Sequence, residues 1–129
     1  MKLIYFALIH LFTISCTAES NMNHKSFQFS KEPQIHILSP KDGEVIKDDK
    51  IVLKLHVVDF DLVAPDKEPV ANEGHVQVWI DNMEFRGSKT EFVFENESDG
   101  EHTIKAELML SNHTVLPYSK TVKVIINKT

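Results

Sequence analysis

The sequence predicts an all-β domain built as an antiparallel sandwich of about seven strands. Three observations predict it. From Gln34 onward, hydrophobic residues recur at every second position, which is the period of a strand with one buried face. Residues that favour turns separate these stretches. No stretch of this region shows the hydrophobic period of a helix.

The strands follow from this alternation in chain order. The first ends at the turn Pro40-Lys41-Asp42-Gly43, and the third and fourth are joined by a tight hairpin at Asp81-Asn82. Between the second and third lies an acidic stretch, 59–73, whose prolines indicate a solvated loop. The expected strands cover residues 34–37, 51–58, 75–80, 83–85, 92–94, 103–110 and 122–126.

The N-terminal part of the chain predicts export. Lys2 precedes a continuous apolar run that is shorter than the roughly 20 residues needed to span a bilayer, so a cleaved signal peptide is favoured over a membrane helix. Cys16, the single cysteine, ends this run where a lipidated first residue of a mature protein would lie. Cleavage after Ala18 is the alternative. We therefore expect a signal peptide over 1–15, a lipidated Cys16 and flexible tether over 16–32, and one sandwich domain over 33–127.

Charge and composition restrict the partners. The segment 1–15 removes one of the 14 basic residues and none of the 19 acidic ones, so the mature net charge is 13 − 19 = −6. Nucleic-acid-binding proteins usually present a basic face, and none is visible. We expect an extracytoplasmic, membrane-anchored protein whose partners are the membrane, through the lipid, and an unidentified protein or cell-surface ligand, with no nucleic acid.

The sequence lacks the common catalytic motifs, such as a G-x-S-x-G elbow, an H-E-x-x-H pair or a phosphate-binding glycine loop. A binding or accessory module without catalytic activity is the expected function. Acidic residues of the loop 59–73 could bind calcium, but no D-x-D-x-D run is present.

Two resemblances support this expectation. The segment Ser98–Ala106 resembles the start of the sixth strand of immunoglobulin-like domains, with His102 where those domains carry a structural tyrosine corner. Residues 35–126 also resemble an uncharacterised family of bacterial periplasmic and lipoprotein domains. The ordered motifs are Ser-Pro-Lys-Asp-Gly at 39–43, Gly-His-Val-Gln at 74–77, Gly-Glu-His-Thr at 100–103 and Asn-His at 112–113. The resemblance implies an immunoglobulin-like sandwich, with Gln77 in place of the family's second strand histidine.

One group of residues suggests a metal site. In an immunoglobulin-like order the third and sixth strands are antiparallel neighbours, so His75, Met109 and His113 should gather at one pole, with Glu73 contributed by the loop. Histidine with methionine suits copper, and histidine with carboxylates suits zinc. The alternative function is therefore a copper- or zinc-binding protein, and the alternative for these residues is ordinary polar loop ends.

Overall fold

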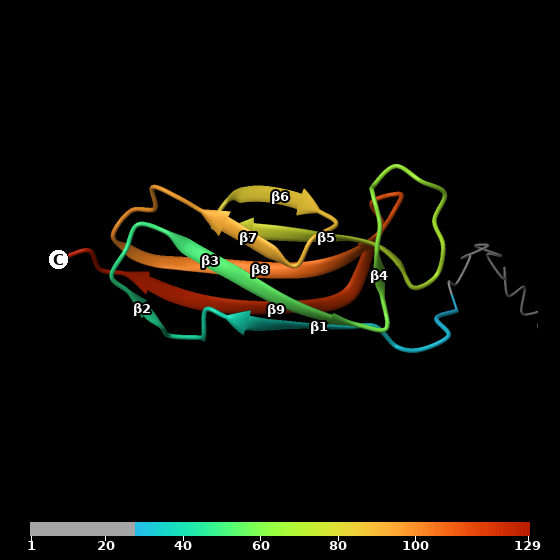
Figure 1. The fold of residues 1–129 in the computed structure, drawn as a ribbon, viewed down its shortest axis with the longest axis horizontal. Coiled ribbons are helices and arrows are strands. Elements are labelled where there is room, and N and C mark those ends of the chain that lie inside the picture. The colour runs from blue at the N-terminus through green and yellow to red at the C-terminus, as the bar shows by residue number, and fades with distance from the viewer. Residues whose placement is uncertain (1–27) are drawn as a thin grey trace, which may run out of the picture.

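The computed structural model describes residues 28–129, which form two β-sheets packed face to face (Figure 1). The predicted signal peptide, Cys16 and most of the predicted tether lie outside these residues. The strands are β1 (Gln34–Ser39), β2 (Val45–Ile46), β3 (Ile51–Val58), β4 (Asp61–Leu62), β5 (Glu73–Ile80), β6 (Met83–Gly87), β7 (Glu91–Phe94), β8 (Gly100–Leu110) and β9 (Val115–Ile126). Within residues 28–129, no helix is long and apolar enough to span a bilayer.

The two sheets differ in size. The smaller has the order β1-β3-β7, and the larger has the order β2-β9-β8-β5-β4. In the larger sheet β4 pairs with residues 73–74 of β5, and β6 pairs with residues 76–80. All pairs are antiparallel except β2 with β9 and β4 with β5. The neighbours β5 and β8 are the predicted third and sixth strands, so the sandwich topology expected from the alternation is confirmed.

The core lies between the sheets and follows the period-two pattern. One face of each long strand points inward, and its side chains are almost fully excluded from solvent. The central members are Ile51 and Leu53 of β3, Val76, Val78 and Ile80 of β5, and Ile104, Ala106 and Leu108 of β8. A core of this kind holds the domain together through apolar burial, with no cystine among the described residues.

The structure adds elements that the alternation does not predict. The two-residue strands β2 and β4 are too short to show a period, and β4 falls inside the expected loop 59–73. Strand β9 begins at Val115 rather than at 122. The alternation does not predict residues 115–121, because most of them are exposed.

The end of the predicted tether contacts the sandwich. The ring of Phe29 packs edge-on against Tyr118, with 5.9 Å between centroids. Ser30 donates its backbone N–H to Asn72 Oδ1 at 3.0 Å, and Asn72 Nδ2 donates to the Lys31 carbonyl at 2.8 Å. The chain therefore enters the domain beside the β4–β5 loop (Figure 1).

Candidate metal centre

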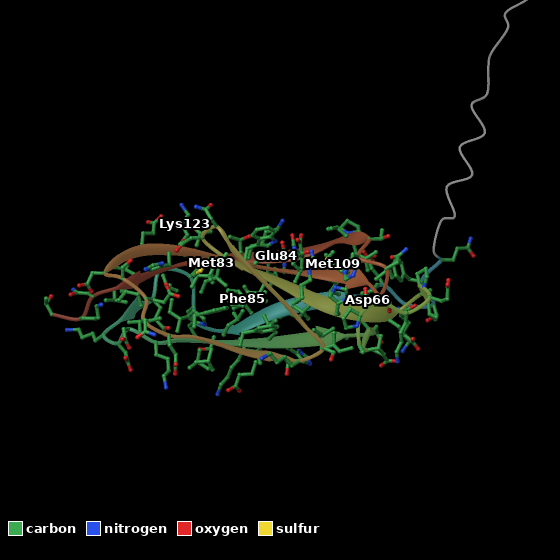
Figure 2. All side chains as sticks on the ribbon, turned by 90° about the horizontal axis from the view of Figure 1, so that it is seen from above. Asp66, Met83, Glu84, Phe85, Met109 and Lys123 are labelled. Atoms are coloured by element: carbon green, nitrogen blue, oxygen red, sulfur yellow. The ribbon has the colours of Figure 1, made fainter. Side chains whose placement is uncertain are left out.

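The pairing of β5 with β8 places His75 directly opposite Met109, as the strand order predicts. Both residues alternate with core residues, so their side chains lie on the outer face of the larger sheet. Directly opposite residues have Cβ atoms about 5 Å apart. Figure 2 shows Met109 and Asp66 at the same end of the molecule. We call this end, formed by the start of β5, the end of β8, the β8–β9 turn and the β4–β5 loop, the site pole.

Gly74 allows the two strands to approach closely at the site pole. A Cβ atom built on Gly74 would lie 1.8 Å from the backbone oxygen of Met109 and 2.9 Å from the Phe60 ring. No side chain fits there, so glycine before His75 is required by the packing of β5 against β8.

The β8–β9 turn brings His113 to the same place. The turn is closed by Leu110, which donates its N–H to the Thr114 carbonyl at 2.9 Å and accepts from the His113 N–H at 2.9 Å. His113 has a φ of 67°, in the left-handed region that few residues other than glycine adopt. Its ring centroid lies 5.1 Å from that of His75, and the rings meet edge to face at 74°.

The polar atoms of this pair lack partners. His75 is 0 % exposed, and neither of its ring nitrogens has a hydrogen-bond partner among residues 28–129. The buried Nδ1 of His113 has none there either. Because the large majority of buried polar side-chain atoms are hydrogen-bonded, three such nitrogens in one contacting pair require an explanation.

Electrostatics keep His75 neutral. Burial lowers the pKa of His75 below its ordinary value of 6.5, and the neighbouring His113 and Arg86 lower it further, while Asp66 acts in the opposite direction. A neutral imidazole retains a lone pair on one ring nitrogen, and this is the form that binds a metal.

Met109 and Glu73, the other two predicted metal ligands, differ in how deeply they are buried. The Met109 side chain is 3 % exposed and therefore belongs to the buried group. Glu73 lies on the same face of β5 as His75, but it is only half-buried, and no ion pair or hydrogen bond joins its carboxylate to either histidine within the described chain. The structure thus brings together His75, Met109 and His113 and leaves Glu73 at their margin.

Two further residues of the site pole were not predicted. Gln77, two positions after His75 on the same face, is 4 % exposed and has a buried Oε1 without a partner among the described residues. The alternation of β5 could have identified it. Asp66 contacts His113 Nε2 through Oδ1 at 2.8 Å. It comes from a loop without periodicity, and nothing in the sequence indicates this contact.

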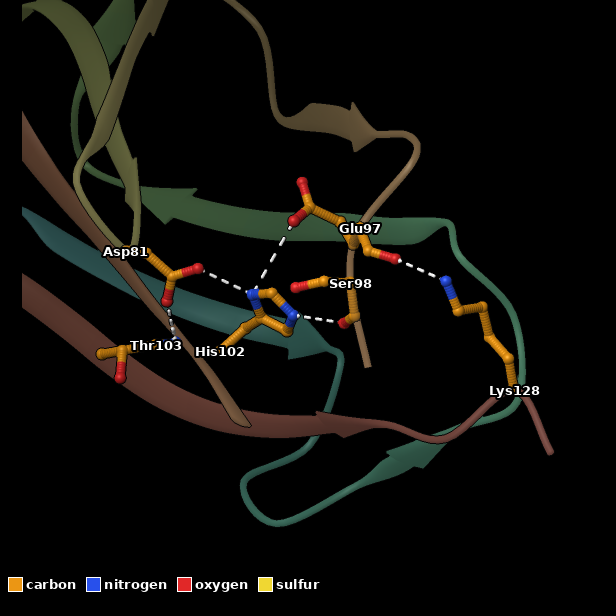
Figure 3. Close-up of polar contacts among 6 residues, drawn as sticks. All are labelled: Asp81, Glu97, Ser98, His102, Thr103 and Lys128. Atoms are coloured by element: carbon orange, nitrogen blue, oxygen red, sulfur yellow. Dashed lines mark hydrogen bonds and ion pairs between the residues drawn. The ribbon is translucent and has the colours of Figure 1, made fainter. Parts of the chain in front are cut away.

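His102 lies at the opposite end of β8 and has a different environment (Figure 3). Its Nδ1 lies 2.6 Å from Asp81 Oδ2 and 3.7 Å from Glu97 Oε2, and its Nε2 lies 2.7 Å from the Ser98 carbonyl oxygen. Asp81 Oδ1 also accepts the Thr103 N–H at 2.9 Å. The ring therefore joins the β5–β6 turn to the β7–β8 loop, which is a structural arrangement.

Asp81, Glu97 and His102 have ligand atoms within 4.8 Å of one another, as a cation site would require. However, both ring nitrogens of His102 already face oxygen acceptors, so each must carry a proton to make its hydrogen bond. A protonated imidazole has no lone pair for a metal, and the site pole is the better candidate.

Comparison with known proteins identifies the fold. No family model and no curated protein matches the chain. Among solved structures, it is similar to a fibronectin(III)-like module of Clostridium thermocellum CbhA, with a TM-score of 0.57 and 16% sequence identity over 74% of this chain and 98% of that one. An engineered protein matches with a TM-score of 0.51 and 16% identity, over 74% of this chain and 20% of its own. The domain is thus an immunoglobulin-like β-sandwich.

Proposed function

We propose that this protein is an exported, lipid-anchored immunoglobulin-like module without catalytic activity, and that it binds one reduced copper ion at the site pole. His75, Met109 and His113 are the proposed ligands. The single observation that supports this function is the buried contact between two histidines whose three inward nitrogens have no partner among the described residues.

A purely structural role explains this pair poorly. A buried polar group without a hydrogen bond destabilises the fold by about 1–3 kcal/mol, so a histidine placed only for packing would be paired or replaced by an apolar residue. A bound metal ion would accept one lone pair from each imidazole and so would account for two of the three nitrogens. The opposed position of Met109 supplies a third donor atom on the same face.

The donor set favours copper over zinc. Zinc sites in proteins use histidine, cysteine thiolate and carboxylate ligands, whereas the thioether of methionine is a soft ligand that selects Cu(I). Glu73, the carboxylate that would favour zinc, stands outside the buried group. Two imidazoles and one thioether would give three soft or intermediate ligands, of which His75 and Met109 are buried.

The three proposed ligands would have different roles. His75 is fully buried and neutral, so it would hold the ion in the interior of the site. His113, whose side chain is 35% exposed, would form the outer wall and the point of entry. Met109 would set the preference for the reduced ion. Such a site suits storage or transfer of copper outside the cytoplasm.

The test is a competition titration of the full chain with Cu(I), under anaerobic reducing conditions, against a chromogenic Cu(I) chelator. All proteins carry Cys16→Ser, which removes a competing thiolate. We expect one Cu(I) per chain. Met109→Leu preserves the side-chain volume and removes only the sulfur, and it should weaken binding about tenfold or more, as should His113→Ala.

The matched controls are Met83→Leu on β6, a methionine that is 51% exposed, and His56→Ala, an exposed histidine on β3 of the other sheet. Both should bind as the parent does. Absence of saturable binding in the parent, or equal affinities for site and control variants, would refute the copper function.

A further inference from the structure

The acidic loop between β4 and β5 contacts the proposed ligand His113 through the side chain of Asp66. Asp66 Oδ1 lies 2.8 Å from His113 Nε2, and the Asp66 backbone N–H donates to the Ser111 carbonyl at 2.9 Å. Asp66 therefore contacts the β8–β9 turn both before and at His113. Asp66 itself has a φ of 66°, so this residue and His113 both adopt left-handed backbone conformations where they meet.

This contact decides which ring nitrogen of His113 has a free lone pair. A carboxylate only accepts hydrogen bonds, so the nitrogen facing it must be the one that carries the proton. In the neutral ring the proton is then on Nε2 and the lone pair is on Nδ1. Nδ1 is the His113 atom that is buried without a partner among the described residues. The opposite tautomer would set a lone pair against the carboxylate.

We propose that Asp66 is a positioning residue of the metal site, which fixes His113 as an Nδ1 ligand and orients its ring toward the metal. This inference rests on the proposed copper function. A carboxylate behind a ligand histidine orients the ring and strengthens its donor atom, and loss of such a partner typically costs 10–100-fold in metal affinity. The acidic loop is then part of the metal site, although Asp66 touches no metal.

The rest of the loop is held independently of Asp66. At its base, Asn72 Nδ2 donates to the Asp59 carbonyl at 2.7 Å and to the Lys31 carbonyl at 2.8 Å. Val63 donates its N–H to the Gly74 carbonyl at 2.7 Å. A change of the Asp66 side chain should therefore free the His113 ring without releasing the loop base or unfolding the domain.

The experiment compares the parent with Asp66→Ala, Asp66→Asn and the control Glu68→Ala, all in the Cys16→Ser chain. Glu68 is an exposed acid of the same loop. The first readout is the ¹⁵N chemical shifts of the His113 ring in metal-free protein, at a pH where the ring is neutral. We expect the Nε2–H tautomer in the parent and in Glu68→Ala, and a mixture of tautomers in Asp66→Ala.

The second readout is Cu(I) affinity from the competition titration. Asp66→Ala should bind about 10–100-fold more weakly than the parent. Asp66→Asn should lie between them, since its amide oxygen still accepts from Nε2–H but has no charge, and Glu68→Ala should be unchanged. A purely structural Asp66 would alter neither the tautomer nor the order of these affinities.

The outcomes separate this inference from the function on which it rests. If the parent binds Cu(I) and Asp66→Ala binds equally well, Asp66 is not a positioning residue while the copper function stands. An Nδ1–H tautomer in the parent would overturn the inference in the same way. If the parent binds no Cu(I), the copper function fails, and this inference fails with it.

Discussion

At the scale of single residues, His75 is the position where stability and the proposed function conflict. It is fully buried, and its ring nitrogens have no partner among residues 28–129. Its neighbours across the sheet and in the turn, Met109 and His113, add no hydrogen bond to it. Binding sites often retain such unfavourable groups at the expense of stability.

Replacement of His75 by leucine should therefore stabilise the metal-free protein. His75→Leu removes two unpaired buried polar atoms and keeps a side chain of similar size, so the free energy of unfolding should rise by about 1–2 kcal/mol. Urea denaturation in the presence of a metal chelator measures this change.

The control is His56→Leu, which changes an exposed residue and should alter stability by no more than about 0.5 kcal/mol. A clear loss of stability in His75→Leu would contradict the interpretation, because it would mean that the imidazole makes favourable hydrogen bonds in the folded protein.

The sequence predicts which face of a sheet a residue lies on better than it predicts whether that residue is buried. Alternation along β5 and β8 places His75 and Met109 on the non-core face, and the strand order predicts that they meet. It does not predict that they are buried, because alternation describes only the strand itself. Here His113 of the β8–β9 turn packs against His75 on that face, and Asp66 of the acidic loop contacts His113.

At the scale of elements, His102 joins two connections at the far end of β8 (Figure 3). Burial lowers its pKa, but the hydrogen bonds to the Ser98 carbonyl and to Asp81, with the charges of Asp81 and Glu97, outweigh this effect and raise the pKa above 6.5. The folded state thus favours the imidazolium, which donates from both nitrogens.

These contacts of His102 should make the free energy of unfolding depend on pH. Because the folded-state pKa of His102 exceeds the unfolded value of 6.5, its contribution is complete below pH 6.5 and is lost as pH rises through the folded-state pKa. Asp81→Asn removes the carboxylate but can still accept the Thr103 N–H. We expect the stability difference between parent and Asp81→Asn to shrink as pH rises above 6.5, in urea denaturation at a series of pH values.

Asp42→Asn is the matched control, since Asp42 accepts a backbone N–H from Lys123 at 2.9 Å and is absent from the contacts of His102. Its stability difference from the parent should stay constant over the same range. An Asp81→Asn difference that is equally constant would show that His102 is not held as the imidazolium.

Connections are predicted less well than strands. Apolar alternation predicts β1, β3, β5, β7, β8 and the second half of β9, and the hairpin turn at Asp81-Asn82 predicts β6. The strands β2 and β4 consist of two residues each and show no pattern. The contact of Asp66 with His113 joins residues 47 positions apart through two irregular segments. Hydrogen bonds between loops depend on the folded arrangement and have no periodic sequence pattern.

At the scale of the whole molecule, the chain enters the sandwich at the site pole. Ser30 and Lys31 hydrogen-bond to Asn72, at the base of the loop that bears Asp66. If Cys16 is lipidated, as proposed, the predicted tether joins the lipid to the end of the domain that bears the proposed copper ligands.

Lipid anchoring at Cys16 predicts that loss of this cysteine changes the distribution of the protein between membrane and soluble fractions. Cys16→Ser should move the protein from the membrane fraction to the soluble extracytoplasmic fraction, because acyl chains provide the attachment. Immunoblots of fractionated cells measure this, with Ser15→Ala as the control. Equal partition of Cys16→Ser and parent would instead favour cleavage after Ala18.

The most direct test of the copper site is X-ray absorption spectroscopy at the copper edge of the Cu(I)-loaded Cys16→Ser chain. We predict a three-coordinate Cu(I) with two nitrogen ligands and one sulfur ligand, and Met109→Leu should lose the sulfur while Met83→Leu retains it. A spectrum of the parent without sulfur, or a sulfur ligand that persists in Met109→Leu, would contradict the assignment of His75, Met109 and His113 as the metal centre.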